Sequence, residues 1–391
     1  MRLLFIANRF PYPPFRGDKL KIYNLVKQLS KIHEIDLITF VEQQSDYQYL
    51  DELKPFFKNI VLQDLPKWKS VLNVLLGFFN AKPLQVNYFK STGFSKKVKQ
   101  LIDENNYDAI HVQHLRMAQY AINISHPNVI LDLPDAFSLY WERRKTVKRN
   151  FFVKILDNIE SKKVMKYEAL VLSKFKKSLV CSIEDSDFLV KKHGVKNIDI
   201  LPNGVDISVF KPSNHDYSHN NQLLFTGNMD YAPNVDAVIY FVSEVLPIIQ
   251  EKRKVKFIIA GQRPIEKVKI LDNGETIFVT GFIQDLTSVY NDASVVVAPL
   301  RFGAGTQNKV LEAMAMGIPV VCSNIGFQGL GIENGQGAFM KTNAAEFAQQ
   351  VIELLDSEEL RRKTGELGIH VIQSKFSWEN IANQLDAIFK Q

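Results

Sequence analysis

The fold is decided by residues 301–323, RFGAGTQNKVLEAMAMGIPVVCS. An apolar strand, SVVVAPL, leads into this stretch, and a glycine-containing loop follows at residues 303–308. Residues 309–316 predict a short helix that ends at Gly317, because glycine favours the position just after a helix. The residues IPVV then begin another strand. The order of strand, loop, helix and strand is typical of a parallel α/β sheet.

The loop before this helix is suited to bind an anion. Backbone N–H groups are free at a helix N-terminus, and the helix dipole adds partial positive charge there. Glu312, one turn into the helix, is placed to accept hydrogen bonds from ribose hydroxyls. A βαβ turn whose glycines serve only tight packing would give the same pattern, so the spacing alone leaves both interpretations open.

The length and composition limit which classes of protein this chain can belong to. A chain of 391 residues is too long for one hydrophobic core and predicts two domains. Cys181 and Cys322 are its only cysteines, which indicates neither a disulfide framework nor structural zinc. The N-terminus lacks the features of a signal peptide. The most apolar run, residues 71–79, is shorter than the roughly 20 residues that span a bilayer, so we expect a cytoplasmic protein.

The net charge of +6 is unevenly distributed. Residues 1–205 hold 32 Lys and Arg against 21 Asp and Glu, whereas the remainder holds 16 against 21, so the balances are +11 and −5. The basic half suits an anionic membrane surface or an anionic acceptor. A merely solvated basic surface is the alternative. Nothing else favours nucleic acid, and we expect no nucleic-acid partner.

The first half of the chain begins with a βαβ unit. Residues 2–7 and 35–40 read as buried strands, with an amphipathic helix at 19–30 between them. Ligands bind at the carboxyl ends of parallel strands, so the proline-rich loop at 11–18 is at the right end for a site. Gly17 would allow close backbone approach to a substrate, or serve only the turn.

Polar side chains follow two further strands of this half. His111, His114 and Arg116 lie at or just past the end of a strand at residues 107–113, and Asp135 follows the next strand. A lone histidine is more often a core or surface residue than a catalyst. Because three such residues gather at one strand end, the core and ligand-binding interpretations both stay open.

Residues 64–100 depart from the alternating pattern, because they mix large apolar side chains with seven lysines. An amphipathic basic insertion that touches lipid would have this composition. So would a pair of helices packed on the core of the domain, which is the interpretation that we favour.

The α/β pattern restarts after a polar segment at residues 211–221, where we place the linker. We predict an N-terminal domain at 1–205, a C-terminal domain at 206–375, and a final helix at 376–391 that packs back toward the N-terminal domain. Two such doubly wound sheets would face each other across a cleft that holds a nucleotide on one side and an acceptor on the other.

Four motifs carry a resemblance to a known family. LPNGVD, TGNMDYAPNVDA, VTGFIQDLTSVYNDASVVVAPL and GAGTQNKVLEAMAMGIPVV resemble the retaining glycosyltransferases of the GT-B fold, family 4. MDYAPNVDA with NKVLEAMAMG is similar to the sugar transferases of bacterial exopolysaccharide systems. The resemblance is strongest over residues 198–331. It implies a nucleotide-diphosphate sugar donor in the C-terminal half, an acceptor in the N-terminal half, and transfer with retention that needs neither metal nor cofactor.

The resemblance also implies roles for individual residues. Donor binding falls to the glycine loops, the segment that frames the base, and the start of the helix at 309–316: Gly17, Gly227, Asn228, Phe282, Ile283, Arg301, Gly303, Gly305, Thr306, Gln307, Asn308 and Glu312. Catalysis falls to three basic residues, His114, Lys309 and Arg263. Acceptor binding falls to Arg16, His111, Arg116 and Asp135.

Two positions depart from the family pattern. The family often has a glutamate eight positions before the one that matches Glu312, and here that position is Ala304. That glutamate handles the donor sugar, so the identity of the sugar stays open. The family also often has basic residues where this chain has Asn228, so Arg263, Arg301 or Lys309 must neutralise the phosphates.

The mechanism that we expect needs no strong general base. The acceptor hydroxyl attacks the sugar from the face that the nucleotide leaves, and a donor phosphate oxygen accepts the proton. A nucleotide-sugar epimerase or hydrolase of the same fold is one alternative, and a non-catalytic binding scaffold is another. A nicotinamide oxidoreductase is disfavoured, because no GxGxxG follows the first strand.

Overall fold

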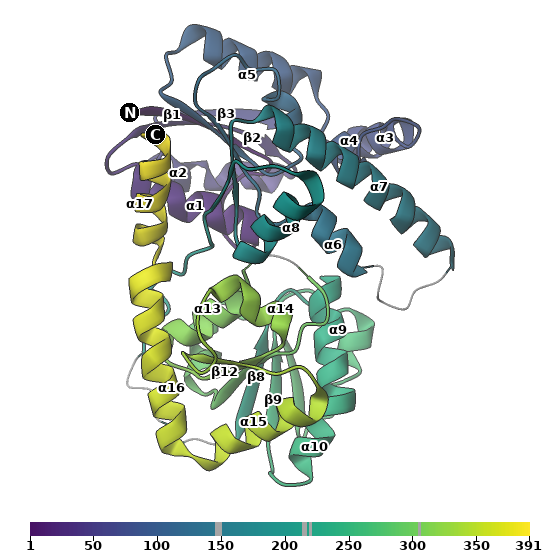
Figure 1. Cartoon of the computed structure of the whole chain (residues 1–391), viewed down its shortest axis with the longest axis vertical. Helices are drawn as coiled ribbons and strands as arrows, with labels where there is room; N and C mark the ends of the chain where they lie inside the picture. The colour runs from purple at the N-terminus through teal and green to yellow at the C-terminus, as the bar shows by residue number, and fades with distance from the viewer. Residues whose placement is uncertain (145–150, 213–216, 219–220, 304–305) are drawn as a thin grey trace. The chain divides into compact units, whose positions relative to one another are not determined.

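The computed structural model describes residues 1–144, 151–212, 217–218, 221–303 and 306–391. The chain forms two compact domains, coloured along the sequence in Figure 1. The N-terminal domain comprises Met1–Pro202 together with Ile381–Gln391, and the C-terminal domain comprises Asn203–Asn380. The boundary therefore precedes the predicted linker at 211–221, of which residues 213–216 and 219–220 lie outside the described residues. The cleft between the domains stays a prediction.

The N-terminal domain is built on a parallel sheet of seven strands in the order β3-β2-β1-β4-β5-β6-β7. The strands are β1 (Arg2–Ala7), β2 (Glu34–Val41), β3 (Asn59–Asp64), β4 (Ala109–Gln113), β5 (Val129–Asp132), β6 (Lys177–Val180) and β7 (Ile198–Ile200). The chain order reverses between β1 and β4. That switch point, at the carboxyl ends of the strands, is where doubly wound sheets bind ligands.

Helices cover both faces of this sheet. They are α1 (Gly17–Leu29), α2 (Leu50–Leu53), α3 (Lys67–Gly77), α4 (Leu84–Tyr88), α5 (Thr92–Glu104), α6 (Phe137–Arg144), α7 (Phe151–Lys174) and α8 (Ile183–His193). Alternate residues of a strand point to opposite faces. Leu4 and Ile6 of β1 therefore face the cluster that contains α5 and α7, whereas Phe5 faces the side where Phe389 lies.

The C-terminal domain repeats the design with six parallel strands in the order β10-β9-β8-β11-β12-β13. They are β8 (Gln222–Thr226), β9 (Lys256–Ala260), β10 (Ile277–Gly281), β11 (Val295–Ala298), β12 (Val320–Cys322) and β13 (Ala338–Met340). Its switch point lies between β8 and β11. Two parallel α/β domains were predicted from the sequence, and the structure confirms them.

The helices of this domain also lie on both faces of the sheet. They are α9 (Ala232–Tyr240), α10 (Leu246–Gln250), α11 (Glu266–Lys269), α12 (Leu286–Asn291), α13 (Asn308–Ala315), α14 (Asn324–Phe327), α15 (Ala344–Asp356) and α16 (Glu358–Val371). One apolar cluster joins the sheet to α9, α10 and α15, and another joins it to α12 and α13. The predicted helix end at Gly317 is confirmed, since this glycine has φ 76°.

One helical run in the described part of the chain, Ala232–Gln250, is long and apolar enough to cross a bilayer. Half of the most apolar 18-residue stretch of this run is buried inside the protein. Ala237, Phe241 and Val245 of this run pack in the core beside β8 and β9. These contacts identify it as a core helix of the C-terminal domain.

The last helix, α17 (Trp378–Phe389), supplies the core of the N-terminal domain with its final turns. Phe389 packs edge-on against Phe5, with 6.4 Å between ring centroids. Its carbonyl oxygen accepts a hydrogen bond from Asn128 Nδ2 at 2.8 Å, and Asp386 lies 2.8 Å from His33 Nε2. Residues 381–391 thus belong to the N-terminal domain, although they follow the C-terminal domain in sequence.

The structure corrects the favoured interpretation of residues 64–100. The predicted pair of helices is present as α3 and α4, and Val86 and Phe89 near α4 are buried in the core. In α3, by contrast, the large apolar side chains Trp68, Leu75 and Leu76 are exposed. The hydrophobic side of α3 therefore does not pack on the core of its own domain.

Candidate functional site

Two glycine turns shape the switch point of the C-terminal sheet. Gly227 and Gly261, which end β8 and β9, both have φ 152°. A Cβ on Gly261 would lie 1.8 Å from the carbonyl oxygen of Gly227. A Cβ on Gly227 would lie 2.6 Å from Nδ2 of Asn234. The two loops therefore approach each other more closely than any other residue type would permit.

The N-terminus of α13 opens at this switch point, just after β11. Gln307 is in the N-cap position with no side-chain capping hydrogen bond, and its carbonyl oxygen accepts from the N–H of Val310. Asn308 Oδ1 accepts from Asn203 Nδ2 at 3.1 Å. Thr306 is buried, and Gly303 has φ 145°. The predicted donor residue Gly305 and the departure at Ala304 lie outside the described residues.

Lys309 is a buried cation in the first turn of α13. Its Nζ donates to Asn234 Oδ1 at 3.1 Å and lies 5.1 Å from the centroid of the Phe225 ring. Burial lowers the pKa of Lys309 to about 8, and the nearby carboxylate of Glu312 opposes this shift only in part. Lys309 is therefore charged at pH 7 and poorly neutralised by the protein itself, which suits it to neutralise an anion.

Glu312 is oriented by a buried tyrosine. Tyr290 donates from its hydroxyl to Glu312 Oε2 at 2.9 Å and shares a 2.8 Å hydrogen bond with Thr226 Oγ1. Burial raises the pKa of Glu312, although the hydrogen bond from Tyr290 and the charge of Lys309 oppose it. Because Tyr290 takes Oε2, the carboxylate is held in one orientation with Oε1 on its other side.

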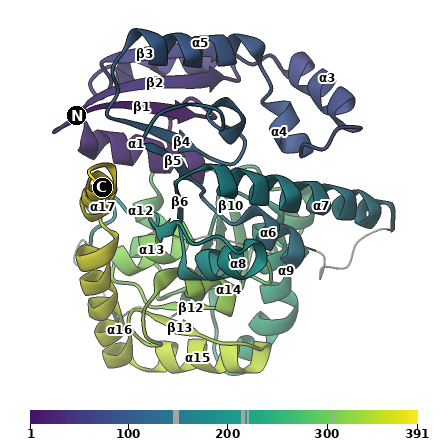
Figure 2. The ribbon, with the colours of Figure 1, turned by 45° about the horizontal axis from the view of Figure 1, so that its top comes forward.

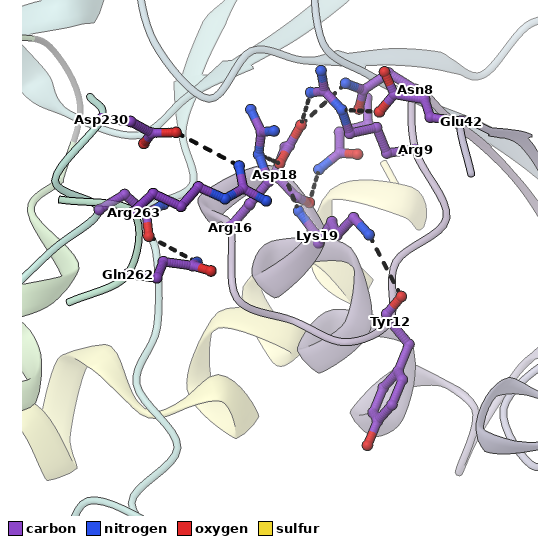
Figure 3. Close-up of polar contacts among 12 residues, drawn as sticks. Asn8, Arg9, Tyr12, Arg16, Asp18, Lys19, Glu42, Asp230, Gln262 and Arg263 are labelled. Carbon is purple, nitrogen blue, oxygen red and sulfur yellow. Dashed lines mark hydrogen bonds and ion pairs between the residues drawn. The ribbon is translucent and has the colours of Figure 1, made fainter. Parts of the chain in front are cut away.

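Two arginines were predicted to neutralise phosphate, and each has a carboxylate partner. Arg301 forms a bidentate pair with Asp236 and lies 4.9 Å from the centroid of the Tyr240 ring. Arg263 lies 3.6 Å from Asp230 (Figure 3) and is 62% exposed. Arg263 therefore has the looser partner and more freedom to bind an anion than Arg301 has.

The segment predicted to frame a base follows β10. Phe282 is more than half exposed, whereas Ile283 packs in part against the cluster beneath α13. Asn228 accepts hydrogen bonds from Gln262 Nε2 at 2.9 Å and, through its carbonyl oxygen, from Asn234 Nδ2 at 3.0 Å. These contacts fix the backbone of the β8 loop that the sequence marked as a donor-binding segment.

The N-terminal switch point is dominated by ion pairs (Figure 3). Arg9, just past β1, donates to Asp18 at 2.7 Å and to Glu42 at 2.5 Å. Burial raises the pKa of Asp18, but the charges of Arg9 and Arg16 outweigh burial and hold that pKa well below its usual range. Asp18 is thus a fixed anion that organises the cations around it.

His114 is held in a strained backbone conformation. It has φ 82°, a region that residues other than glycine rarely adopt. The backbone N–H of Arg116 donates to Nδ1 of His114 at 3.3 Å, so the neutral ring carries its proton on Nε2. Burial and the charge of Arg116 lower the pKa of His114 well below its usual value. His114 is therefore a neutral hydrogen-bond donor.

Arg116 lies beside this histidine. It donates to Gln85 Oε1 at 3.2 Å, and its guanidinium stacks 5.4 Å from the centroid of Phe89, as that of Arg9 also does. Burial, and next the charge of Arg9, lower the pKa of Arg116 to about 10. The guanidinium groups of Arg9 and Arg116 thus both pack against the Phe89 ring, and Asp18 is the main nearby anion.

The structure corrects the acceptor-binding role predicted for His111. This side chain is completely buried in β4 and stacks on Phe5 with 4.5 Å between ring centroids. On its other side lies Phe389 at 6.3 Å, and its Nε2 is 3.2 Å from Asp132 Oδ2. His111 is a core residue, because β4 turns it to the face that α17 covers.

The other predicted acceptor residues lie near the same sheet edge. Asp135 follows β5 and is half-buried, and burial together with the charge of Asp185 raises its pKa to about 7. Arg16 is half exposed, 3.9 Å from Asp18. A Cβ on Gly17 would meet nothing within 4 Å, so the packing of the protein does not require this glycine.

Several residues of these sites were missed in the sequence. Arg9 and Asp18 flank the first loop, and a basic residue directly after a strand was a signal that could have found Arg9. Asn234 and Tyr290 hold Lys309 and Glu312, yet neither stands out by type or spacing. Among the described residues, no group of three His, Cys, Asp or Glu side chains is placed to hold a metal ion.

A family model covers most of the C-terminal domain. Residues 220–357 match the model described as "Glycosyl transferases group 1". This segment contains both glycine turns, α13, Lys309 and Glu312. These residues of the C-terminal domain are therefore similar to the group 1 glycosyl transferases.

Relatives match this chain beyond that domain. An uncharacterized 44.6 kDa protein in the cps region of Klebsiella pneumoniae is 25% identical over 364 residues, which cover 90% of each chain. An uncharacterized glycosyltransferase of Methanocaldococcus jannaschii is 23% identical over 390 residues, covering 97% of this chain and 96% of the relative.

Solved structures show the fold of this chain. Sucrose-phosphate synthase from Thermosynechococcus elongatus aligns with a TM-score of 0.74 at 16% identity, covering 100% of this chain and 98% of that one. Anabaena HepE, solved in complex with UDP, aligns with a TM-score of 0.70 at 15% identity and full coverage of both. The fold is therefore GT-B-like, as the sequence predicted.

Proposed function

We propose that this glycosyltransferase moves a sugar from a nucleotide-diphosphate sugar to an acceptor hydroxyl, with retention of configuration and without a metal ion. One observation carries the proposal. The N-terminus of α13, the buried cation Lys309 and the oriented carboxylate Glu312 meet at the switch point of the domain that resembles the group 1 glycosyl transferases. An anion and a diol are the two ligand groups that this set of side chains suits.

The donor would use this set in two parts. The backbone N–H groups at the start of α13, with Lys309, would stabilise the charge that develops on the leaving diphosphate. Oε1 of Glu312 would accept from the ribose hydroxyls, since Tyr290 holds Oε2. The HepE structure contains UDP, which supports a uridine nucleotide as the first candidate for this chain.

The reaction that we propose forms one bond and breaks another on the same face of the sugar. The acceptor oxygen bonds to the anomeric carbon, the bond from that carbon to the diphosphate oxygen breaks, and the acceptor proton passes to a phosphate oxygen of the donor. The nucleoside diphosphate leaves. The neutral ring of His114, with its proton on Nε2, would donate a hydrogen bond to a sugar hydroxyl rather than act as an acid.

The biological setting follows from one relative. The Klebsiella protein is encoded in the cps region, and it matches nine-tenths of this chain. We therefore place this enzyme in bacterial surface polysaccharide or glycolipid synthesis, at the cytoplasmic side where nucleotide sugars are made.

A thermal-shift panel of UDP-, GDP- and ADP-sugars tests the donor. A bound donor stabilises the folded state by mass action, so one nucleotide class is expected to raise Tm and the others to leave it unchanged. NMR of the product made with the stabilising donor then reports the anomeric configuration, and inversion would contradict the proposed chemistry.

Lys309→Met tests the site itself. Removal of one group that stabilises a leaving anion costs about 10²–10³ in turnover, and we expect a loss of that size. Lys267→Met, at an exposed position of the same domain, is the matched control. Near-normal turnover of the Lys309 variant would remove this lysine from the mechanism.

The alternatives have distinct outcomes in the same experiments. Consumption of the donor with no acceptor present would indicate a hydrolase or epimerase. Failure of every nucleotide sugar in the panel to shift Tm would indicate a binding scaffold without transferase activity.

A further inference from the structure

α3 presents its apolar side to solvent. Trp68 is 70% exposed, Leu76 70% and Phe79, just past the helix, 92%. Val71, Leu72, Leu75 and Phe78 are exposed as well. The helix positions 68, 71, 72, 75 and 76 follow the spacing of one helix face, so these side chains form a continuous stripe. We call Trp68, Val71, Leu72, Leu75, Leu76, Phe78 and Phe79 the α3 face.

The orientation of α3 is fixed by the polar seam beneath it. Asn73 donates to the carbonyl oxygen of Lys90 at 2.9 Å. A Cβ on Gly77 would lie 2.4 Å from the side chain of Asn87, so the helix is in direct contact with α4 there. Asn87 also donates to Asn80 Oδ1 at 3.1 Å. Small and polar residues therefore form the inner side, which leaves the apolar residues outside.

α7 supports the far end of this hairpin. Lys163 donates to the carbonyl oxygen of Phe78 at 2.6 Å and lies 5.6 Å from the centroid of its ring. Glu160 accepts from the backbone N–H of Leu84 at 2.8 Å. Figure 2 shows α3 and α4 projecting beyond the sheet of the N-terminal domain on the side to which α7 also extends. The contacts with α7 thus fix the position of the segment that carries the α3 face.

The charge around the α3 face decides what covers it. Residues 65–102 contain seven lysines and not one Asp, Glu or Arg. Lys67 and Lys69 flank Trp68, and Lys82 and Lys90 lie in the segment around α4. A second copy would bring Lys67 and Lys69 again to the same contact, and this like charge disfavours self-association. An apolar stripe edged by lysines and aromatic rings complements a bilayer that carries anionic lipids.

The dimensions of α3 limit how it meets a bilayer. Its 11 residues extend about 16 Å, whereas a helix must extend about 30 Å to cross the hydrocarbon core. α3 would therefore lie in the plane of the interface, with Trp68 and Phe79 below the level of the headgroups. We propose that the α3 face docks the N-terminal domain on an anionic membrane surface, which would bring the enzyme to lipid-linked acceptors.

Flotation of the full chain with vesicles tests this proposal. We expect recovery with phosphatidylcholine vesicles that contain 30% phosphatidylglycerol, and weaker recovery with phosphatidylcholine alone or in 0.5 M salt. Lys67→Gln with Lys69→Gln should weaken partitioning about fivefold per lysine, because each basic residue near such a surface contributes about 1 kcal/mol. Leu76→Ser with Phe79→Ser should weaken it roughly tenfold or more with both vesicle types.

Matched controls separate docking from damage to the fold. Ile270→Ser changes a side chain of the C-terminal domain that is 71% exposed, against 70% for Leu76, and should leave flotation unchanged. Every variant should keep the wild-type Tm and donor-induced Tm shift, because the changed side chains are exposed or, for Lys69, partly exposed. The emission of Trp68, measured against a Trp68→Phe variant, should shift to shorter wavelength with anionic vesicles.

Two outcomes would overturn the proposal. One is failure of the wild-type chain to float with anionic vesicles at low salt. The other is a dimer in solution that Leu76→Ser with Phe79→Ser converts to a monomer, since the α3 face would then bind a second copy. Both outcomes are independent of whether a nucleotide sugar binds the C-terminal domain.

Discussion

In the N-terminal domain, charged side chains line the switch point between β1 and β4, whereas glycines, asparagines and a single lysine line the corresponding point between β8 and β11. Arg9, Asp18 and Glu42 neutralise one another in the first domain. In the second, Lys309 has an amide and a phenyl ring as its nearest partners. The same topology thus gives one site built on direct ion pairs and one in which the buried lysine donates to an amide instead of a carboxylate.

This difference bears on how each site is organised. Buried ion pairs cost desolvation energy but fix geometry when they are complete. Amides at a helix N-terminus and a lysine without a direct ion pair suit an incoming anion. Topology therefore sets where each site lies, and the side chains set which ligand charge it accepts.

The largest effect is expected where the glycine-lined site is closed. Gly261→Ala places a Cβ 1.8 Å from a backbone oxygen in a conformation that alanine disfavours, so it should destabilise the C-terminal domain by about 4 kcal/mol or more. Gly274→Ala, at φ 68° with nothing within 4 Å, should cost about 1–2 kcal/mol. Urea unfolding measures both, and equal losses would refute the close approach of the two loops.

The next effect breaks the charged site. Asp18→Asn leaves Arg9 with Glu42 as its remaining carboxylate partner and Arg116 without its main nearby anion, and should cost about 3 kcal/mol at pH 7. Because the folded-state pKa of Asp18 is depressed, its contribution is present above the unfolded value of 3.8 and is lost as the pH falls through the folded value. The difference between wild type and variant should therefore shrink below pH 4. A difference that is constant with pH would contradict the pairing.

The lowered pKa of Lys309 predicts that donor binding depends on pH. Its pKa of about 8 means that the free site loses charge above pH 8, while the donor phosphates stay fully ionised. The Kd for UDP should rise up to about tenfold per pH unit above pH 8, with proton uptake on binding. Calorimetry in two buffers of different ionisation enthalpy measures both quantities. Lys309→Met should bind weakly and show neither effect.

The smallest effect concerns a carboxyl group at the edge of the charged site. Asp135 has a folded pKa raised to about 7, so the folded state holds a proton that the unfolded state releases near pH 4, and stability falls as the pH rises between these values. Asp135→Asn should raise Tm by a few degrees at pH 8 and by less at pH 5. Fluorimetry across pH 5–8.5 tests this. A lower Tm at pH 8 would show that the charge of Asp135 is stabilising.

The strands were accessible from the sequence because they are short apolar runs between turn residues. The predicted strand at residues 2–7 coincides with β1, and the apolar runs at residues 222–226 and 256–260 form β8 and β9. The cap at Asp285 was also predictable, since its side chain accepts from the N–H of Thr287 at the start of α12. Such features depend on neighbours in sequence, which is why one chain suffices to find them.

The pair His111 and His114 shows where sequence reasoning ended. Both are close to the end of the same apolar run. The position at which β4 ends decides that His111 is a core residue and that His114 is not. His111 lies within the strand, opposite Phe5, and the alternation of the strand could have marked it as buried. The positive φ of His114 has no comparable signal, because histidine is not a residue type that requires it.

α3 shows a second limit. Its composition revealed apolar residues and lysines, but not which side would face the protein. That choice depends on Asn73, Gly77 and Asn87, which close the contact with α4 by hydrogen bonds and close approach. From hydrophobicity alone, we predicted that the apolar side of α3 packs on the core. The polar contacts with the segment around α4 instead leave that side exposed.

The placement of residues 381–391 has a consequence for the order in which the chain folds during synthesis. Domains usually fold in sequence as they leave the ribosome, the N-terminal one first. Here the core around Phe5 and His111 lacks Phe389 until nearly 390 residues have been made. The C-terminal domain therefore has all its residues before the N-terminal domain does. The half of the chain that is translated first is the half whose core is completed last.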